Sequence, residues 1–334
     1  MSEPAPSPSR GISRGLIVAV GLSLFVATIV VAWIGFGQVF AALSRIGWRG
    51  LAVLAAWSVL PIALLGSAWF TLERPWRAAD WGLYVWARMV RDASGELLPF
   101  SHVGGFVIGA RAATLQGLSP TWAFASTVVD VTAELVAQIG FTALGVVLLV
   151  TRLDAGSARE GLIGASLAGL GITAAAAAAL IGLQRRGMGL ILALARRFLP
   201  VAAAGAAETG SIIADLHARP GRFSLAVGAH LAAWVASALG PWLALRAAGI
   251  EIGPLAIIGL ESLVMAVRSA TFVAPMGIGV QEASYALLGP LFGLGPEVAL
   301  AVSLIKRARD ILIGLPVLLV WQGLEGRRLI AGRG

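Results

Sequence analysis

The sequence contains no cysteine, which excludes disulfides, thiolate metal sites and thiol catalysis. Charged residues make up only 13% of the chain, against about 25% in soluble domains. The three histidines, His102, His217 and His230, lack metal-ligand spacing, so neither a metal nor another cofactor is expected. The low content of charge argues against a soluble protein, and the missing cysteine and metal-ligand spacings exclude thiol and metal chemistry.

Long apolar runs take the place of charge, since 58% of the residues are hydrophobic. The longest runs approach or exceed the roughly 18–20 residues that cross a bilayer as a helix. The sequence therefore predicts an all-α polytopic membrane protein with about six spanning helices plus two broken or re-entrant hairpins. The predicted spans cover residues 16–36, 51–72, 121–150, 161–183, 223–245 and 297–322.

We attribute the net charge of +8 to loops that face the cytoplasm, because Lys and Arg of a membrane protein stay on that side. No basic stripe interleaved with aromatics is present, so nucleic acid is not an expected partner. We expect a disordered cytoplasmic N-terminus over 1–14, one membrane domain over 15–326 and a cytoplasmic tail over 327–334. For the Arg-rich cytoplasmic connection at 184–222, the sequence suits an amphipathic stretch at 188–198 followed by a short polar helix at 208–217, before Pro220. An ordinary cytoplasmic loop is the alternative.

Two apolar stretches, 81–118 and 254–295, are interrupted by proline, glycine and charge. Irregular backbone at membrane depth is tolerated only where it is buried in protein or lines a polar cavity. We therefore expect helical hairpins there. Their predicted tips comprise Pro99, Gly104, Gly105, Pro275, Gly277 and Gly279.

These stretches resemble each other at an offset of 176 residues: Pro99 matches Pro275, and Gly117-Leu118-x-Pro120 matches Gly293-Leu294-x-Pro296. The repeat cores are assigned to 78–150 and 254–323. With both termini and the 184–222 connection inside, loop 151–160 falls outside and the two copies are inverted. Inverted repeats of broken helices are a common transporter plan with a site near the midplane.

Charges occur inside these segments, where each costs at least about 2.5–3.5 kcal/mol on insertion scales. Arginine suits a phosphate head group because its fork donates two parallel bonds. The head-group candidates are Arg268, Arg307, Arg309, Arg111 and Gln281. The candidates for a charge network or for carrying protons are Asp130, Glu134, Glu96, Glu261, Glu282, Lys306 and Asp310.

A structural ion-pair network that holds the repeats together is the alternative to a substrate cavity, and the two are compatible. Asp130 and Glu134 lie four residues apart and share a helix face, as do Lys306 and Asp310. If a pseudo-two-fold axis relates the repeats, Asp130 and Glu134 should approach Lys306 and Arg309.

Several motifs carry a family resemblance: Gly95-Glu-Leu-Leu-Pro99, Val103-Gly-Gly105, Arg111, Val129-Asp-x-Thr-x-Glu134 with Gln138, Glu261-Ser-Leu263 with Arg268, Gly279-Val-Gln-Glu282, and Lys306-Arg-x-Arg309. With them the chain, from about 50 to 323, resembles the flippase-like superfamily named for the transmembrane region of lysylphosphatidylglycerol synthase. Within it, the sequence is most similar to the hopanoid-biosynthesis-associated branch. Phe106 stands where many relatives are expected to have an acidic residue.

This resemblance implies lipid handling in the bacterial inner membrane, with a hopanoid or anionic phospholipid as the partner lipid. The soluble aminoacyl-transferase domain of the fused enzymes is not found, so lysyl transfer is not expected and the chain is predicted not to be an enzyme. Two other functions stay open: a scaffold or accessory subunit for lipid-biosynthesis enzymes, and a membrane-embedded lipid-modifying enzyme.

Overall fold

The computed structural model describes residues 35–73, 77–98, 101–152, 200–270 and 278–331, with five isolated positions between 164 and 182. All regular structure in these residues is helical, which confirms the predicted all-α class. Three helical stretches are long and apolar enough to cross a bilayer: Phe36–Phe70, Pro120–Val150 and Pro220–Ala247. The total number of spans stays a prediction.

Proline starts several of these helices. Five begin at a proline: α6 (Pro120–Val150), α9 (Pro200–His217), α10 (Pro220–Ala247), α11 (Pro254–Ala270) and α13 (Pro296–Ala331). The first helical position favours proline because its missing N–H has no partner there. In α6, the Ser119 side chain also accepts a hydrogen bond of 3.2 Å from the Trp122 N–H, which caps the helix.

The first described helices are α2 (Phe36–Trp57) and α3 (Val59–Phe70). Gly47 interrupts α2 with a φ of 58°, a left-handed conformation that glycine adopts easily. Residues before this break are helical too, so helical structure begins at Phe36, ahead of the predicted span 51–72. A short turn, η1 (Ala78–Asp80), leads into the next helix.

The first predicted hairpin consists of α4 (Trp81–Leu97) and α5 (Ser101–Leu115). A Cβ on Gly105 would lie 2.7 Å from the Arg91 carbonyl, and one on Gly109 would lie 2.6 Å from the Arg91 Cβ. Gly104 and Gly105 thus lie inside α5, not at the tip as predicted, and Gly105 lets the two helices approach closely. Pro99 lies outside the described residues.

The second predicted hairpin consists of α11, α12 (Val280–Leu288) and the short turn η4 (Gly289–Phe292). Gly279 starts α12 with a φ of 81°, and its N–H donates to Glu282 at 2.7 Å. Gly279 thus lies at the edge of the connection, as expected for a tip residue. Pro275 and Gly277 lie outside the described residues.

The same turn leads from each hairpin into its long helix. In the first copy the Leu118 N–H donates to the Ala113 carbonyl at 3.3 Å, and in the second Leu294 donates to Gly289 at 3.0 Å. Gly117 and Gly293 have positive φ angles of 109° and 85°. These bonds keep the offset of 176 residues, so the backbone repeats where the sequence repeats.

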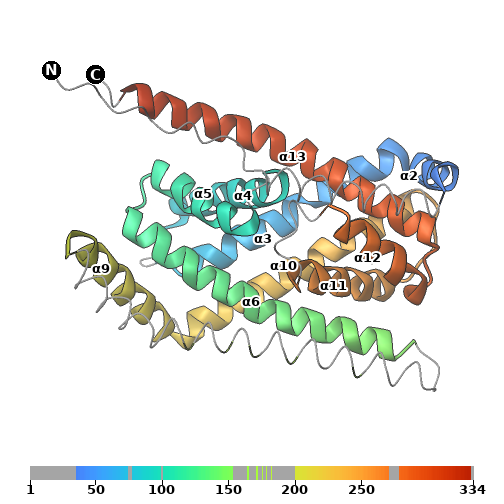
Figure 1. The fold of residues 1–334 in the computed structure, drawn as a ribbon, viewed down its shortest axis with the longest axis horizontal. Coiled ribbons are helices and arrows are strands. Elements are labelled where there is room, and N and C mark those ends of the chain that lie inside the picture. The colour runs from blue at the N-terminus through green and yellow to red at the C-terminus, as the bar shows by residue number, and fades with distance from the viewer. Residues whose placement is uncertain are drawn as a thin grey trace, which may run out of the picture.

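The two long helices, α6 and α13, lie along opposite edges of the molecule with the hairpins between them (Figure 1). Each packs against the hairpin of the other copy through a glycine. A Cβ on Gly145 of α6 would meet Ser262 of α11, and one on Gly314 of α13 would lie 3.3 Å from the Ala93 Cβ of α4. The two larger apolar cores of the described residues lie one around each hairpin.

Other boundaries follow the predictions in part. The polar helix predicted at 208–217 ends at His217 in α9, but begins earlier, at Pro200. Helix α13 runs to Ala331, so the predicted tail at 327–334 begins as helix. Span 16–36 up to residue 34, most of span 161–183, the amphipathic stretch 188–198 and the N-terminal segment 1–14 lie outside the described residues.

Candidate functional site: two buried charge clusters and their connection

The charges predicted inside the membrane domain gather in two clusters, one in each core. The first cluster is built by α4, α6 and α10, and comprises Arg88, Arg91, Asp92, Asp130, Glu134 and His230. The second cluster is built by α11, α12 and α13, and comprises Glu261, Gln281, Glu282, Tyr285, Ser303, Lys306 and Arg307.

In the first cluster, Arg88 and Arg91 are 3% exposed and Asp130 is fully buried. Arg88 donates to Glu134 at 2.7 and 3.1 Å and to Asp92 at 2.9 Å. Arg91 donates to Asp130 at 2.6 Å and also to Glu134. Two guanidinium groups are therefore held between three carboxylates, which offsets the cost of burying them.

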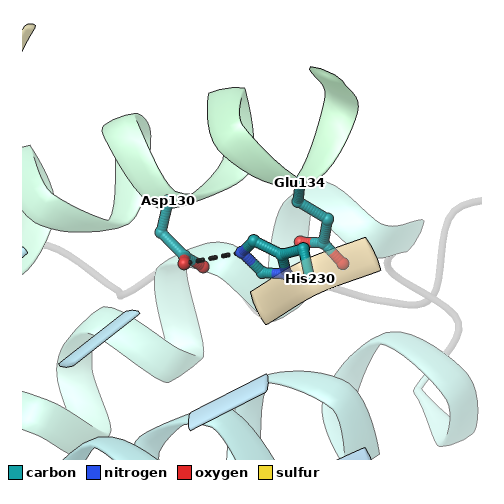
Figure 2. A group of neighbouring side chains, drawn as sticks. All are labelled: Asp130, Glu134 and His230. Carbon is teal, nitrogen blue, oxygen red and sulfur yellow. Dashed lines mark hydrogen bonds and ion pairs between the residues drawn. The ribbon is translucent and has the colours of Figure 1, made fainter. Parts of the chain in front are cut away.

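His230 of α10 closes the first cluster from the opposite side. Figure 2 shows Asp130 and Glu134 projecting from one face of α6 toward the imidazole. The His230 Nε2 lies 2.9 Å from the Asp130 Oδ1. Ligand atoms of these three residues lie within 4.8 Å of one another, a spacing that suits a cation, but the guanidinium groups of Arg88 and Arg91 already engage the same carboxylates.

In the second cluster, Glu261 accepts hydrogen bonds from the Tyr285 hydroxyl and from Lys306. Tyr285 also accepts from the Lys306 Nζ at 2.8 Å. Arg307 donates to Glu282, with one of its contacts at 3.1 Å. Gln281, a predicted head-group contact, is buried and donates to the Ser303 hydroxyl at 3.0 Å, so its amide serves packing between α12 and α13.

An ion pair joins the two hairpins. Arg268, near the end of α11, donates to Glu96, near the end of α4, at 2.7 and 2.8 Å. Asp310 of α13 lies close enough to both for electrostatic interaction, and Arg309 lies 2.9 Å from Asp310 and donates to Ser58 at 3.0 Å. We call Glu96, Arg268, Arg309 and Asp310 the central band.

The central band is partly exposed. Its side chains are 14–25% exposed, against 0–4% for Arg88, Arg91, Asp130 and His230 in the first cluster, where Glu134 is 15% and Asp92 is 38% exposed. The band lies where both hairpins approach their breaks and where α13 passes between the cores. Charges thus reach the protein surface at the junction of the two repeats.

A family model described as "Lysylphosphatidylglycerol synthase TM region" matches residues 16–317. The chain belongs to this family. No curated protein and no solved structure matches the chain. As a member of the lysylphosphatidylglycerol synthase transmembrane-region family, the chain is a multi-pass membrane protein related to lipid-modifying or flippase-like proteins.

The family match covers both clusters and the central band. It ends before Glu325, which accepts a 2.9 Å hydrogen bond from Arg111, and before Arg328, which donates to the Leu115 carbonyl at 2.6 Å. Arg111, another predicted head-group contact, is 51% exposed at its side chain. It lies outside both clusters, and its hydrogen bond to Glu325 connects α5 to the end of α13.

The ion pairs predicted between the two long helices are wrong. Asp130 and Glu134 do not pair with Lys306 or Arg309, since their partners are Arg88, Arg91 and His230. Lys306 pairs with Glu261. The physical reason is that each hairpin supplies the opposite charges for its own long helix: Arg88 and Arg91 pair with α6, and Glu261 and Glu282 pair with α13.

Four members of the first cluster were not among the predicted site residues: Arg88, Arg91, Asp92 and His230. Two signals in the sequence point to three of them. Arg88 and Arg91 are three residues apart on one helix, and His230 interrupts an otherwise apolar stretch of span 223–245. An ionisable residue within a membrane span is a functional-site hypothesis by default.

Proposed function

We propose that the protein moves an amphiphilic lipid between the leaflets of the bacterial inner membrane without changing its covalent structure. The observation that carries this proposal is the central band. Partly exposed charges at the middle of a membrane domain are too costly to face hydrocarbon. They therefore favour a polar path between the two repeats.

Arg268 is the proposed head-group contact in this path. Glu96 already holds its guanidinium through two hydrogen bonds to one nitrogen. A lipid phosphate presents the same kind of charged oxygens and favours the planar fork of arginine. In the proposed step the phosphate replaces Glu96 on Arg268, and Asp310 and Arg309 adjust to the change in charge.

The repeated backbone supports alternating exposure of this path. The two copies share the same turn at the same offset, and each long helix packs on the hairpin of the other copy. We propose that the copies are inverted, with both termini in the cytoplasm, as the Arg distribution favours. Rocking of one repeat against the other would then open the central band to each leaflet in turn.

The chemistry of the band favours an anionic phospholipid or a hopanoid with a polar head. The hopanoid proposal rests on the sequence resemblance alone. An association with lipid-biosynthesis enzymes would fit either lipid.

Reconstitution into liposomes tests this function. Purified protein should translocate a fluorescent anionic phospholipid or a labelled hopanoid, and Arg268→Gln should lose most of that rate while keeping its unfolding midpoint. Arg246→Gln is the matched control, because Arg246 stacks on Trp242 at the end of α10, outside the central band. Unchanged translocation by Arg268→Gln at unchanged stability would remove Arg268 from the site.

A scaffold for lipid-biosynthesis enzymes is the second candidate function, and the first cluster favours it. Its charges are mutually paired, and all of them except that of Asp92 are largely buried, as a purely structural network requires. The two functions differ in the liposome experiment. If the protein is a scaffold, the wild-type protein should translocate none of the tested lipids. If the central band is structural too, Arg268→Gln should also lower the unfolding midpoint.

A further inference from the structure

The first half of α2 is a short helical segment with a glycine at each end. Gly35 precedes it with a φ of 104°, and Gly47 follows it with a φ of 58°. Both angles lie in the left-handed region, which glycine adopts easily and where the chain leaves the helical path. Segment 36–46 can therefore run in a different direction from the rest of α2. Figure 1 shows α2 changing direction at one end of the molecule.

Segment 36–46 has one buried face and one exposed apolar face. Val39, Ala42 and Ile46 form the buried face and are at most 8% exposed, since α2 packs against α10 and α13. Phe36 and Phe40 lie four residues apart and share a second face of the helix. Their side chains are 64% and 70% exposed, so this second face is covered by no part of the chain that the structure describes.

The third face of the segment is polar. Gln38 and Arg45 are exposed and lie seven residues apart, which places them on the same side of the helix at about 100° per residue. The same rotation puts them roughly opposite Phe36 and Phe40. A helix that crosses hydrocarbon has no place for such a polar face, and a helix in water exposes few large apolar side chains. The pattern is typical of a helix lying in the membrane–water interface.

Trp48 and Arg49 extend this pattern beyond the break at Gly47. Trp48 is 75% exposed, and the guanidinium carbon of Arg49 lies 5.8 Å from the centre of its ring. Tryptophan is enriched at the level of the lipid head groups. Arg45 donates to the Gly249 carbonyl at 3.1 Å. Within the described ranges, neither arginine forms an ion pair with a carboxylate, so both suit the phosphates of a lipid surface.

We propose that segment 36–46, together with Trp48 and Arg49, is a docking surface for the anionic head-group layer of one leaflet. Phe36 and Phe40 would enter the boundary of the hydrocarbon, and Arg45 and Arg49 would bind lipid phosphates. The inference goes beyond the proposed translocation and does not depend on it, because it concerns how the resting protein is seated in the bilayer.

The depth of the central band agrees with this seating. Ser58 follows Gly47 by eleven residues, which is about 16 Å along a helix. Half of the hydrocarbon thickness is about 15 Å. If Gly47 lies at the interface, Ser58 therefore lies near the midplane. Arg309 of the central band donates to the Ser58 hydroxyl at 3.0 Å, so the docking surface would hold the band at the depth where both leaflets are equally far.

Nitroxide labels on single cysteines test the seating, since the chain has no cysteine of its own. Phe40→Cys and Gln38→Cys replace exposed residues on the apolar and the polar face. The labelled proteins are placed in nanodiscs of phosphatidylcholine and phosphatidylglycerol. The ratio of oxygen accessibility to nickel-chelate accessibility should be several-fold higher at position 40 than at position 38.

Three results of this experiment would overturn the proposal. A high ratio at both positions would mark a helix that crosses hydrocarbon, and a low ratio at both would mark a helix in water. Low accessibility of position 40 to both reagents would mean that protein covers the phenylalanine face, as a second copy of the chain would.

The head-group contact is tested by changing the lipid. The label at position 40 should lie deeper in nanodiscs that contain phosphatidylglycerol than in nanodiscs of phosphatidylcholine alone. Arg45→Gln/Arg49→Gln should abolish this difference, and Arg49→Gln alone, which keeps the Arg45–Gly249 hydrogen bond, should reduce it. Arg219→Gln is the matched control and should retain it, because Arg219 already pairs with Asp215. Equal depth in both lipids, or a difference that survives in the double variant, would overturn the assignment of Arg45 and Arg49 to head groups.

Discussion

Arg91 shows how the buried charges of this protein depend on one another. Its guanidinium contacts both Asp130 and Glu134 and lies 4.5 Å from the centre of the Phe106 ring. The face of an aromatic ring attracts a cation. Phe106 of α5 stands where an acidic residue was expected from relatives. Its ring therefore packs over Arg91 of α4 and adds no further charge to the cluster.

Replacing Arg91 should be far more harmful than replacing an exposed arginine. Arg91→Gln leaves the fully buried Asp130 without its arginine partner at 2.6 Å, so we expect a loss of about 3–5 kcal/mol in unfolding free energy. Arg219→Gln is the matched control, because Arg219 pairs with Asp215 at the surface, and should cost about 0–1 kcal/mol. Denaturant unfolding in mixed micelles measures both, and equal losses would show that burial does not set the cost.

At the level of helices, glycine decides where the two copies meet. Gly145 of α6 lies against α11 so closely that a Cβ there would approach the Ser262 Cβ to 2.9 Å. Gly140, one turn earlier on the same helix, is exposed and has open space around it. The two positions therefore separate helix packing from helix propensity.

Gly145→Ala should destabilise the protein by about 1–3 kcal/mol, because overpacking forces α6 away from α11. Gly140→Ala should be neutral or stabilising by up to about 1 kcal/mol, because alanine favours the helix. Thermal unfolding of the two variants in the same detergent compares them. A loss of similar size in both would mean that α6 and α11 do not pack through Gly145.

The helices were predictable from the sequence where an apolar run and a proline start coincide, as in α6 and α10. The turn that follows each hairpin was predictable too, because turns fix proline and glycine at set positions. The partners of the charges were not. The spacing of Asp130 and Glu134 indicates a shared face, but it carries no information on which neighbour that face meets. That neighbour is set by the antiparallel packing of α4 and α5, which places Arg88 and Arg91 against α6.

For the whole molecule, the orientation in the membrane is the first property to test. The Arg distribution predicts both termini and the 184–222 connection in the cytoplasm and loop 151–160 outside. The absence of cysteine allows single cysteines to be labelled cleanly. A cysteine at Ala155 should react with a membrane-impermeant reagent in spheroplasts, and one at Ser2 should react only after lysis. If position 155 is labelled from the cytoplasm alone, the predicted orientation in the membrane is wrong.

Motion of the whole molecule would need the elements that run through both cores to bend between them. Two of them contain a proline: α10 contains Pro241 and α13 contains Pro316. A proline inside a helix removes a backbone hydrogen bond and permits a kink. These positions are the hinges that rocking of the repeats would use.

Pro316→Ala should therefore separate stability from transport. Alanine restores the missing hydrogen bond in α13, and Pro316 is exposed, so its removal leaves no cavity. We expect a gain in unfolding free energy, up to about 3 kcal/mol, together with slower lipid translocation in liposomes. Pro254→Ala is the matched control, because that exposed proline starts α11, where no helical hydrogen bond is missing; it should change neither quantity appreciably. A more stable Pro316→Ala protein with an unchanged translocation rate would show that α13 does not bend during transport.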